Sequence, residues 1–321
     1  MTVYPASATV GGTKPLLALS NLIVDEITFP DGRVMPRTLG GAGLYAATGA
    51  AIWWPKTALV AGVGDDLTEV SDAALPGLGL LADGLLRRSP HTIRSSLTYR
   101  ADGSRTEVPI YGPEHFETMQ LSPDDIPDSL LPAEGTYLFQ PAVSPWWDAV
   151  ASRRDALGTL FWEICLDSHG ETDPRDVKRL CPGLDMVSLN RAEAKRIFRR
   201  DDPERNAATL LNWGCKVAIL RLGEEGSLVI TRSARVMVRP PERVVTDVTG
   251  AGNAFCGGFL GAWCAAPGDV EGAARRAAVS AAHAIGQFGP ADPRDRHDLD
   301  LLLARTRVDG VDRHADGANP R

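Results

Sequence analysis

A glycine-rich turn ahead of an alanine-rich segment is the feature of this 321-residue sequence best suited to chemistry. The turn is Gly250-Ala251-Gly252-Asn253, and small residues continue beyond it at helical spacing. Glycines allow several backbone N–H groups to point one way, and a helix start adds unpaired N–H groups and the positive end of its dipole. These groups would bind a phosphate, or the charge that develops during phosphoryl transfer. The same residues could also form a tight strand-to-helix turn without a ligand.

Asn190 and Glu193 form a second candidate site, because they follow the apolar run Met186–Ser188. Their i,i+3 spacing places both side chains on one face of a helix that begins there. Oxygen ligands with retained water suit Mg²⁺, which is a hard cation. The alternative is structural: Asn190 would cap the helix, and Glu193 would complete a capping box.

Short apolar runs that favour strands alternate with alanine-rich segments that favour helices. The candidate strands are Leu16–Val24, Thr57–Gly62, Thr136–Phe139, Leu160–Ile164, Met186–Ser188, Val217–Leu220 and Leu228–Ile230. The candidate helices are Gly43–Ile52, Trp146–Leu157, Arg191–Arg199, Asp202–Trp213, Gly252–Ala265 and Ala273–Phe288. This alternation predicts an α/β fold with a mostly parallel sheet and helices on both faces. Ligands of such sheets bind at the carboxyl ends of the strands.

Two segments break this alternation. Glu26–Thr38 and Thr92–Tyr111 have period-2 patterns around Asp31-Gly32 and Asp102-Gly103. Asp-Gly between alternating residues is a strong hairpin signal. The two hairpins could form a small sheet beside the main domain, or they could be separate surface features. The polar segment Arg305–Arg321 contains Gly, Asp and Pro, and we expect it to be frayed.

Composition limits the classes of partner. A hydrophobic fraction of 44% with 23% charged residues argues against disorder over most of the chain. The formal charge of −7 provides no basic field for a phosphate backbone, so we expect no nucleic-acid partner. The five cysteines include no CxxC pair, which indicates free thiols. No signal peptide or membrane-spanning stretch is evident, so we predict a soluble, cytoplasmic protein without a membrane partner.

Five motifs carry a family resemblance. The glycine-rich turn resembles D-x-T-G-A-G-D, the diagnostic motif of the PfkB (ribokinase-like) family of sugar and nucleoside kinases. The resemblance extends from about Leu16 to Pro290. The other four motifs are the GG pair in Gly40–Gly43, G-x-V-G-x-D in Ala61–Asp66, a strand with N-x-x-E in Asp185–Glu193, and L-G-x-x-G in Leu220–Ser227. Trp162-Glu163-Ile164 and Gln287–Pro290 resemble a branch of the family best known from fungi.

The resemblance implies a ribokinase-like three-layer α/β/α sandwich. Residues 1–304 would form a single domain, and residues 305–321 would form a polar C-terminal tail. The two hairpins, at about 26–38 and 92–111, would form a small β lid over the substrate. Lids in this family often pair edge to edge, so a homodimer through the lid is a further expectation.

The resemblance also assigns ATP and magnesium to particular residues. Asn190 and Glu193 would hold Mg²⁺ through water and set the phosphates in place. Leu222, Gly223 and Gly226 would shape the nucleotide edge of the site, with Thr249 beside the phosphates. The backbone of Gly250, Ala251 and Gly252 would form the anion hole.

The substrate would be a small sugar-like or nucleoside-like molecule. Asp25 matches the position where the family binds sugar hydroxyls, and a carboxylate can accept two such hydrogen bonds. Gly40 and Gly41 would let the backbone approach the sugar closely. Tyr45 stands where an Asn is expected and adds an aromatic face. Arg105 matches a charged lid position, although a solvated turn explains it equally well.

Asn253 is the principal departure from the family pattern, whose general base is an Asp at this position. An amide cannot take a proton from the substrate hydroxyl near neutral pH. Asp247 is the nearest carboxylate in the sequence, six residues upstream. Three functions therefore stay open: a weakened or altered kinase, a ribokinase-fold enzyme that uses the anion hole for hydrolase, lyase or transferase chemistry, and a non-catalytic ligand-binding protein.

Overall fold

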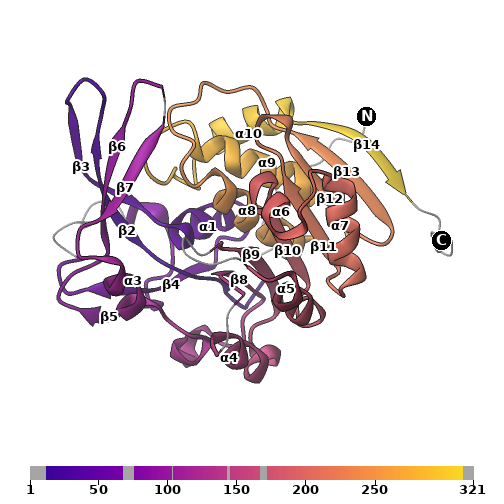
Figure 1. The fold of residues 1–321 in the computed structure, drawn as a ribbon, viewed down its shortest axis with the longest axis horizontal. Helices are drawn as coiled ribbons and strands as arrows, with labels where there is room; N and C mark the ends of the chain where they lie inside the picture. The colour runs from indigo at the N-terminus through magenta and orange to yellow at the C-terminus, as the bar shows by residue number, and fades with distance from the viewer. Residues whose placement is uncertain (1–11, 68–75, 103, 143–144, 167–171, 314–321) are drawn as a thin grey trace.

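The computed structural model describes residues 12–67, 76–102, 104–142, 145–166 and 172–313. The strands are β1 Leu16–Leu19, β2 Ile23–Thr28, β3 Val34–Gly40, β4 Thr57–Gly64, β5 Leu85–Ser89, β6 Arg94–Tyr99, β7 Arg105–Pro109, β8 Gly135–Gln140, β9 Thr159–Ile164, β10 Met186–Asn190, β11 Val217–Arg221, β12 Ser227–Ile230, β13 Ala234–Arg239 and β14 Arg307–Arg313. The helices are α1 Ala42–Ala51, α3 Pro113–Met119, α4 Trp146–Ser152, α5 Pro174–Leu180, α6 Arg191–Phe198, α7 Pro203–Asn212, α8 Ala251–Ala265, α9 Val270–Ala284 and α10 Arg296–Arg305 (Figure 1).

A large sheet forms the centre of the molecule, with strand order β14-β13-β12-β11-β10-β9-β8-β1-β4-β5. The strands from β11 to β5 pair in parallel, and β12, β13 and β14 add antiparallel pairs at one side. The predicted mostly parallel sheet is therefore confirmed.

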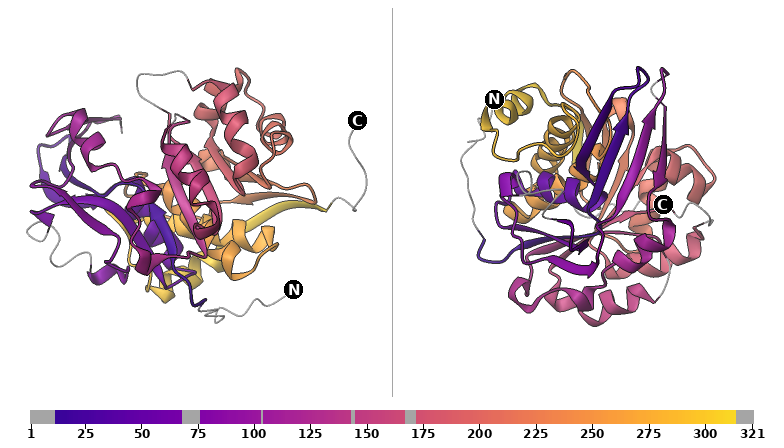
Figure 2. Two further views of the ribbon diagram at one scale, coloured as in Figure 1. Left: turned by 90° about the horizontal axis from the view of Figure 1, so that it is seen from below. Right: turned by 90° about the vertical axis from the view of Figure 1, so that its left-hand side faces the viewer.

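Helices cover both faces of this sheet, because successive side chains of a strand point to opposite faces. Leu16 and Ala18 of β1 belong to a core shared with α1, α8 and α9. Leu17 and Leu19 belong to a second core shared with α4, α5, α6 and α7. Figure 2 shows the two helical layers on opposite sides of the sheet. The predicted three-layer α/β/α architecture is confirmed.

The helices α1 and α8 approach each other at backbone distance. A Cβ atom at Gly257 of α8 would overlap the carbonyl oxygen of Ala46, and one at Gly49 of α1 would overlap that of Ala254. The small residues that follow the glycine-rich turn in the sequence thus serve close helix packing.

The two predicted hairpins form a second, small sheet of order β3-β2-β6-β7, which stands at one end of the large sheet (Figure 1). β2 pairs antiparallel with β3 and parallel with β6, and β6 pairs antiparallel with β7. The expected single strand Leu16–Val24 is wrong in extent, because β1 lies in the large sheet and β2 in the small one. Asn21 lies between them, and its Oδ1 accepts a hydrogen bond from the backbone N–H of Ala42 at 2.8 Å.

The expected frayed tail is also wrong in part, because Arg307–Arg313 forms β14 and pairs with β13. Val308 packs against the main core, and Asp309 pairs with Arg239 at 2.7 Å. Arg307, Asp309 and Gly310 are exposed and Val308 is half-buried, so this edge strand has a mostly polar sequence. Residues 314–321 lie outside the described residues.

All five cysteines are free thiols, as expected. Among the described helices, none is both long and apolar enough to span a bilayer.

Candidate active site

The glycine turn, defined as Gly250–Asn253, leads into α8. Gly250 has φ 74°, and a Cβ atom there would overlap the ring of Tyr45. Both facts require glycine, because L side chains rarely adopt positive φ and the tyrosine ring occupies the space. The backbone N–H of Ala251 donates to the carbonyl of Val248 at 3.3 Å. The next N–H groups of α8, those of Gly252 and Asn253, have no partner within the helix, so the positive end of the helix is available to an anion.

Arg221, the last residue of β11, lies directly beneath the glycine turn. Its Nη1 would overlap a Cβ atom at Gly252. Nη1 also lies 2.8 Å from Oε1 of Glu163, and Nη2 lies 3.4 Å from Oε2 of Glu193. Burial acts to lower the pKa of Arg221, but Glu163 and the other acidic groups outweigh it and raise that pKa. A permanent positive charge is therefore buried under the anion hole.

Asn253 points its amide at the same acidic group. Its Nδ2 donates to Oε2 of Glu163 at 3.2 Å and to the hydroxyl oxygen of Tyr137 at 3.1 Å. The Tyr137 hydroxyl in turn donates to Oε2 of Glu163 at 2.7 Å. Burial raises the pKa of Tyr137 well above its ordinary value, so this hydroxyl keeps its proton.

Sequence reasoning assigned no role to Glu163, Arg221 or Tyr137. Glu163 and Arg221 lie at or next to the carboxyl ends of β9 and β11, which flank β10 in the sheet. A charged residue at such a strand end is the signal that could have identified them, because ligands bind at this edge.

Asn190 and Glu193 form a capping box at the start of α6. Oδ1 of Asn190 accepts from the backbone N–H of Glu193 at 2.8 Å, and Oε2 of Glu193 accepts from that of Asn190 at 2.6 Å. Burial raises the pKa of Glu193. The capping box that was the structural alternative is therefore present, and the role of Asn190 and Glu193 in holding Mg²⁺ stays a prediction. Asn190 and Glu193 carry oxygen atoms, the ligand type that Mg²⁺ prefers, and this cation usually keeps several of its waters.

Most of the predicted substrate residues line one cavity of about 310 Å³ between the glycine turn and the small sheet. Asp25 enters it from β2, and Arg105 enters it from β7. The remaining walls include Asn21, Gly41, Tyr45, Glu107, Thr249, Gly250 and Asn253. Gly40 adjoins the cavity, because a Cβ atom there would overlap the carboxylate of Asp25. The structure therefore brings the predicted substrate residues and the glycine turn together.

Asp25 has unusual electrostatics for a carboxyl group. Burial raises its pKa to about 7, Glu107 and Asp247 add to the shift, and Arg105 opposes it. The Tyr45 pKa is also raised, first by burial and then by Asp247 and Asp25. The cavity therefore holds a carboxyl group whose charge changes near neutral pH.

Asp247 binds residues of the small sheet and of its own loop. Its Oδ1 accepts from Tyr99 at 2.9 Å and from the backbone and side chain of Thr249 at 3.0 and 2.7 Å. Arg105 lies 3.9 Å from the same oxygen and also hydrogen-bonds Thr249. In the described part of the chain, the cavity walls include Thr249 and not Asp247. Asp247 thus joins the small sheet to the loop that precedes the glycine turn.

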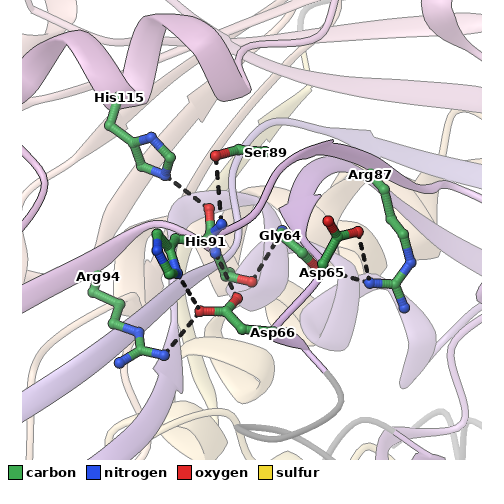
Figure 3. A network of polar contacts seen from close by, with 9 residues as sticks. Gly64, Asp65, Asp66, Arg87, Ser89, His91, Arg94 and His115 are labelled. Atoms are coloured by element: carbon green, nitrogen blue, oxygen red, sulfur yellow. Dashed lines mark hydrogen bonds and ion pairs between the residues drawn. The ribbon is translucent and has the colours of Figure 1, made fainter.

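The Ala61–Asp66 motif anchors the other end of the small sheet (Figure 3). Asp66 accepts a hydrogen bond from the backbone of Thr92 at 2.7 Å and pairs with Arg94 at 2.9 Å. The backbone N–H of Gly64 donates to the hydroxyl of Thr92 at 3.0 Å. The motif therefore fixes the point at which the chain enters β6.

The predicted nucleotide edge is a tight turn between β11 and β12. The backbone N–H of Leu222 donates to the carbonyl of Gly226 at 2.8 Å, and that of Gly226 donates to the carbonyl of Gly223 at 3.0 Å. The turn follows Arg221 directly and so lies at the same edge of the sheet as the glycine turn. Its contact with a nucleotide stays a prediction.

Comparisons with known proteins show the family and the fold of this chain. The sequence matches the family described as pfkB family carbohydrate kinase over residues 31–296. It is 28% identical over 257 residues to a cytidine kinase of Thermococcus kodakarensis, covering 76% of this chain and 87% of that protein. It is 24% identical over 323 residues to an uncharacterized protein of Schizosaccharomyces pombe, covering 87% of this chain and 86% of that protein.

Solved structures share the fold. Aminoimidazole riboside kinase from Salmonella enterica, complexed with aminoimidazole riboside and an ATP analog, has a TM-score of 0.73 and 20% identity, covering 90% of this chain and 100% of that chain. Fructokinase from Vibrio cholerae, in a form with fructose, ADP and calcium ion bound, has a TM-score of 0.73 and 21% identity, covering 90% and 99%. The matched segment 31–296 includes the glycine turn and the strands beneath it, and the chain belongs to the pfkB family of carbohydrate kinases.

Proposed function

We propose that this protein transfers the γ-phosphate of ATP to a hydroxyl group of a small sugar-like or nucleoside-like substrate. One observation carries the proposal: the glycine turn, with buried Arg221 beneath it, opens onto the same cavity as Asp25. An anion hole beside a carboxyl group that can bind a hydroxyl suits phosphoryl transfer to an alcohol, which depends on positioning and charge stabilisation. The kinase names of the relatives support the same reaction class.

The phosphates would lie against the glycine turn, with the nucleotide along Leu222–Gly226. Asn190 and Glu193 would hold Mg²⁺ through water. When bound, the ion neutralises charge on the phosphate oxygens. The buried guanidinium of Arg221 would add a fixed positive charge on the protein side of the anion hole.

The acceptor hydroxyl would lie between Asp25 and Asn253. Its oxygen forms a bond to the γ-phosphorus while the bond from that phosphorus to the ADP oxygen breaks, and its proton passes to a phosphate oxygen or to water. Asn253 can accept a hydrogen bond from this hydroxyl but cannot take its proton. Because general-base catalysis contributes about 10²–10⁴-fold, we expect turnover lower than that of an enzyme with a carboxylate at this position.

The small sheet would act as a lid over the cavity and as the contact surface of a homodimer. Val34 and Val108 on this sheet, and Ile110 directly after it, are exposed, and exposed apolar side chains on a sheet favour pairing. Sedimentation of the wild type and of Val108→Asp tests this, because a dimer through the sheet should dissociate in the variant.

We also propose a cytoplasmic location, which the free thiols support.

ADP formation tests the proposed reaction. Purified protein, ATP and Mg²⁺ would be incubated with a panel of sugars and nucleosides, and we expect acceptor-dependent ADP with at least one of them. Asp25→Asn should abolish the response, whereas Asp176→Asn, a half-exposed acid on α5, should not. Conversion of a candidate substrate without formation of ADP would indicate non-kinase chemistry. Binding of a ligand without any conversion would indicate a binding protein. Either result would replace the kinase proposal.

A further inference from the structure

The orientation of the Asn253 amide follows from its two hydrogen bonds. Nδ2 carries two protons, and the hydroxyl oxygen of Tyr137 and Oε2 of Glu163 accept them at 3.1 and 3.2 Å. Oδ1 must then point away from the Glu163 carboxylate. Because Asn253 lines the cavity that Asp25 also lines, the side of the amide that carries Oδ1 is available to a substrate hydroxyl.

Charge in this cluster is unevenly balanced. Glu163 and Glu193 share one guanidinium, that of Arg221, at 2.8 and 3.4 Å. The side chains of Arg221 and Glu163 are only 12% and 4% exposed, so water screens them little. Two carboxyl groups therefore share a single guanidinium in a buried site.

A carboxylate at position 253 would worsen this balance. The atom in place of Nδ2 would be an oxygen at about the distance that now separates Nδ2 from Oε2 of Glu163, 3.2 Å. Two carboxylates at such a separation cannot both be ionised without a large cost, so one of them stays protonated. The acid at 163 and the amide at 253 are therefore chemically complementary.

We propose that Glu163 is a positioning residue that orients the Asn253 amide so that Oδ1 faces the acceptor hydroxyl, and that its charge excludes an ionised carboxylate at position 253. The orientation toward a substrate hydroxyl rests on the proposed kinase function. The charge relationship does not, and it can be tested without a substrate.

Amide-proton exchange tests the orientation in the wild-type protein. With ¹⁵N-asparagine labelling, the Asn253 side-chain signals are those lost in Asn253→Ser. We expect their exchange to be at least about tenfold slower than that of Asn212, which is exposed on α7, and Glu163→Gln to accelerate it. Exchange at the rate of Asn212 in the wild type would overturn the orientation.

Denaturation across pH tests the charge relationship with Asn253→Asp, Glu163→Gln and the double variant. The pKa of the carboxyl group introduced by Asn253→Asp should be raised in the folded state of the single variant. The urea midpoint of that variant should therefore fall, relative to the wild type, as pH rises from about 5 to about 8. The double variant should lose this fall, and Asn212→Asp should show none. Equal pH profiles for Asn253→Asp and the wild type would overturn the proposal.

Turnover provides a separate result. If the protein is a kinase, the Asn253→Asp variant should not be more active than the wild type at neutral pH. The double variant should be at least about tenfold more active than the Asn253→Asp variant, because the new carboxylate is ionised only in the double variant. An equal gain in the single variant would overturn the proposal.

If no variant forms ADP, the kinase function fails while the exchange and pH experiments still decide the role of Glu163. If the single and double variants that carry Asn253→Asp both fail to fold, amide exchange decides it.

Discussion

Tyr99 of the small sheet donates a hydrogen bond to Asp247 in the loop before the glycine turn, with 2.9 Å between Oη and Oδ1. Tyr99→Phe removes this bond but keeps the stacking of its ring on Phe29. We expect the free energy of unfolding to fall by about 1 kcal/mol and hydrogen exchange in β6 and β7 to increase. Denaturation and exchange measurements check this against Tyr111→Phe, whose ring stacks on exposed His91. Equal effects of the two variants would contradict the prediction.

Asp25 should make stability depend on pH. Its folded-state pKa is raised to about 7, mainly by burial, whereas the unfolded carboxyl group titrates near its ordinary value of 3.8. Between these values the folded state binds the extra proton, so stability falls as pH rises, by up to about 1.4 kcal/mol per pH unit. The Asp25→Asn variant should lack this pH-dependent contribution to stability. The difference between the urea midpoints of the wild type and the variant should therefore change with pH below about pH 7 and be constant above it. Parallel profiles throughout would contradict the assignment.

Gly252→Ala should impair anion binding. The added methyl group would overlap Nη1 of Arg221 and force the guanidinium away from Glu163. We expect ADP, titrated calorimetrically with Mg²⁺, to bind at least about tenfold more weakly, which corresponds to about 1.4 kcal/mol. Gly183→Ala is the matched control, because a Cβ atom there meets open space. Unchanged affinity in Gly252→Ala would show that Arg221 does not support the phosphate site.

Gly257→Ala should destabilise the fold rather than the site. Its methyl group would overlap the carbonyl oxygen of Ala46 and push α1 and α8 apart. Overpacking of this kind costs about 1–3 kcal/mol, so the urea midpoint should fall clearly below that of Gly183→Ala. If the urea midpoint of Gly257→Ala equalled that of the wild type, α1 and α8 would be able to move apart without loss of stability, which would contradict the prediction.

Much of the fold was predictable because local patterns and tertiary contacts agree. Buried strands such as β4 and β9 are apolar throughout most of their length, and the period-2 segments give the paired strands of the small sheet. Asp31-Gly32 lies at the turn between β2 and β3, whereas Gly103 of the second predicted turn lies outside the described residues. The strand predicted at Leu16–Val24 failed because apolar residues lie on both sides of Ser20 and Asn21, where the chain passes from one sheet to the other. β14 was missed because this edge strand is mostly exposed and so has the composition of a polar segment.

The site was predictable where it depends on backbone and less so where it depends on distant side chains. The glycine turn is evident from its residue types alone. The contact between Glu163 and Asn253 is not, because it joins residues 90 positions apart whose proximity depends on the strand order. Asp247 appeared to be a candidate base by its place in the sequence, but its bonds to Tyr99 and Thr249 give it an anchoring role.

The close packing of α1 against α8 has a mechanical consequence. α1 begins directly after β3 of the small sheet, and α8 begins within the glycine turn. Because the backbones touch at Gly49 and Gly257, these two helices cannot slide past each other, and they carry both ends of the site as one rigid block. We therefore expect any opening of the cavity to come from bending within β2, β3 and β6. The hinges would be Asn21, where the chain passes from the large sheet into the small one, and Gly41, where it leaves the small sheet for α1.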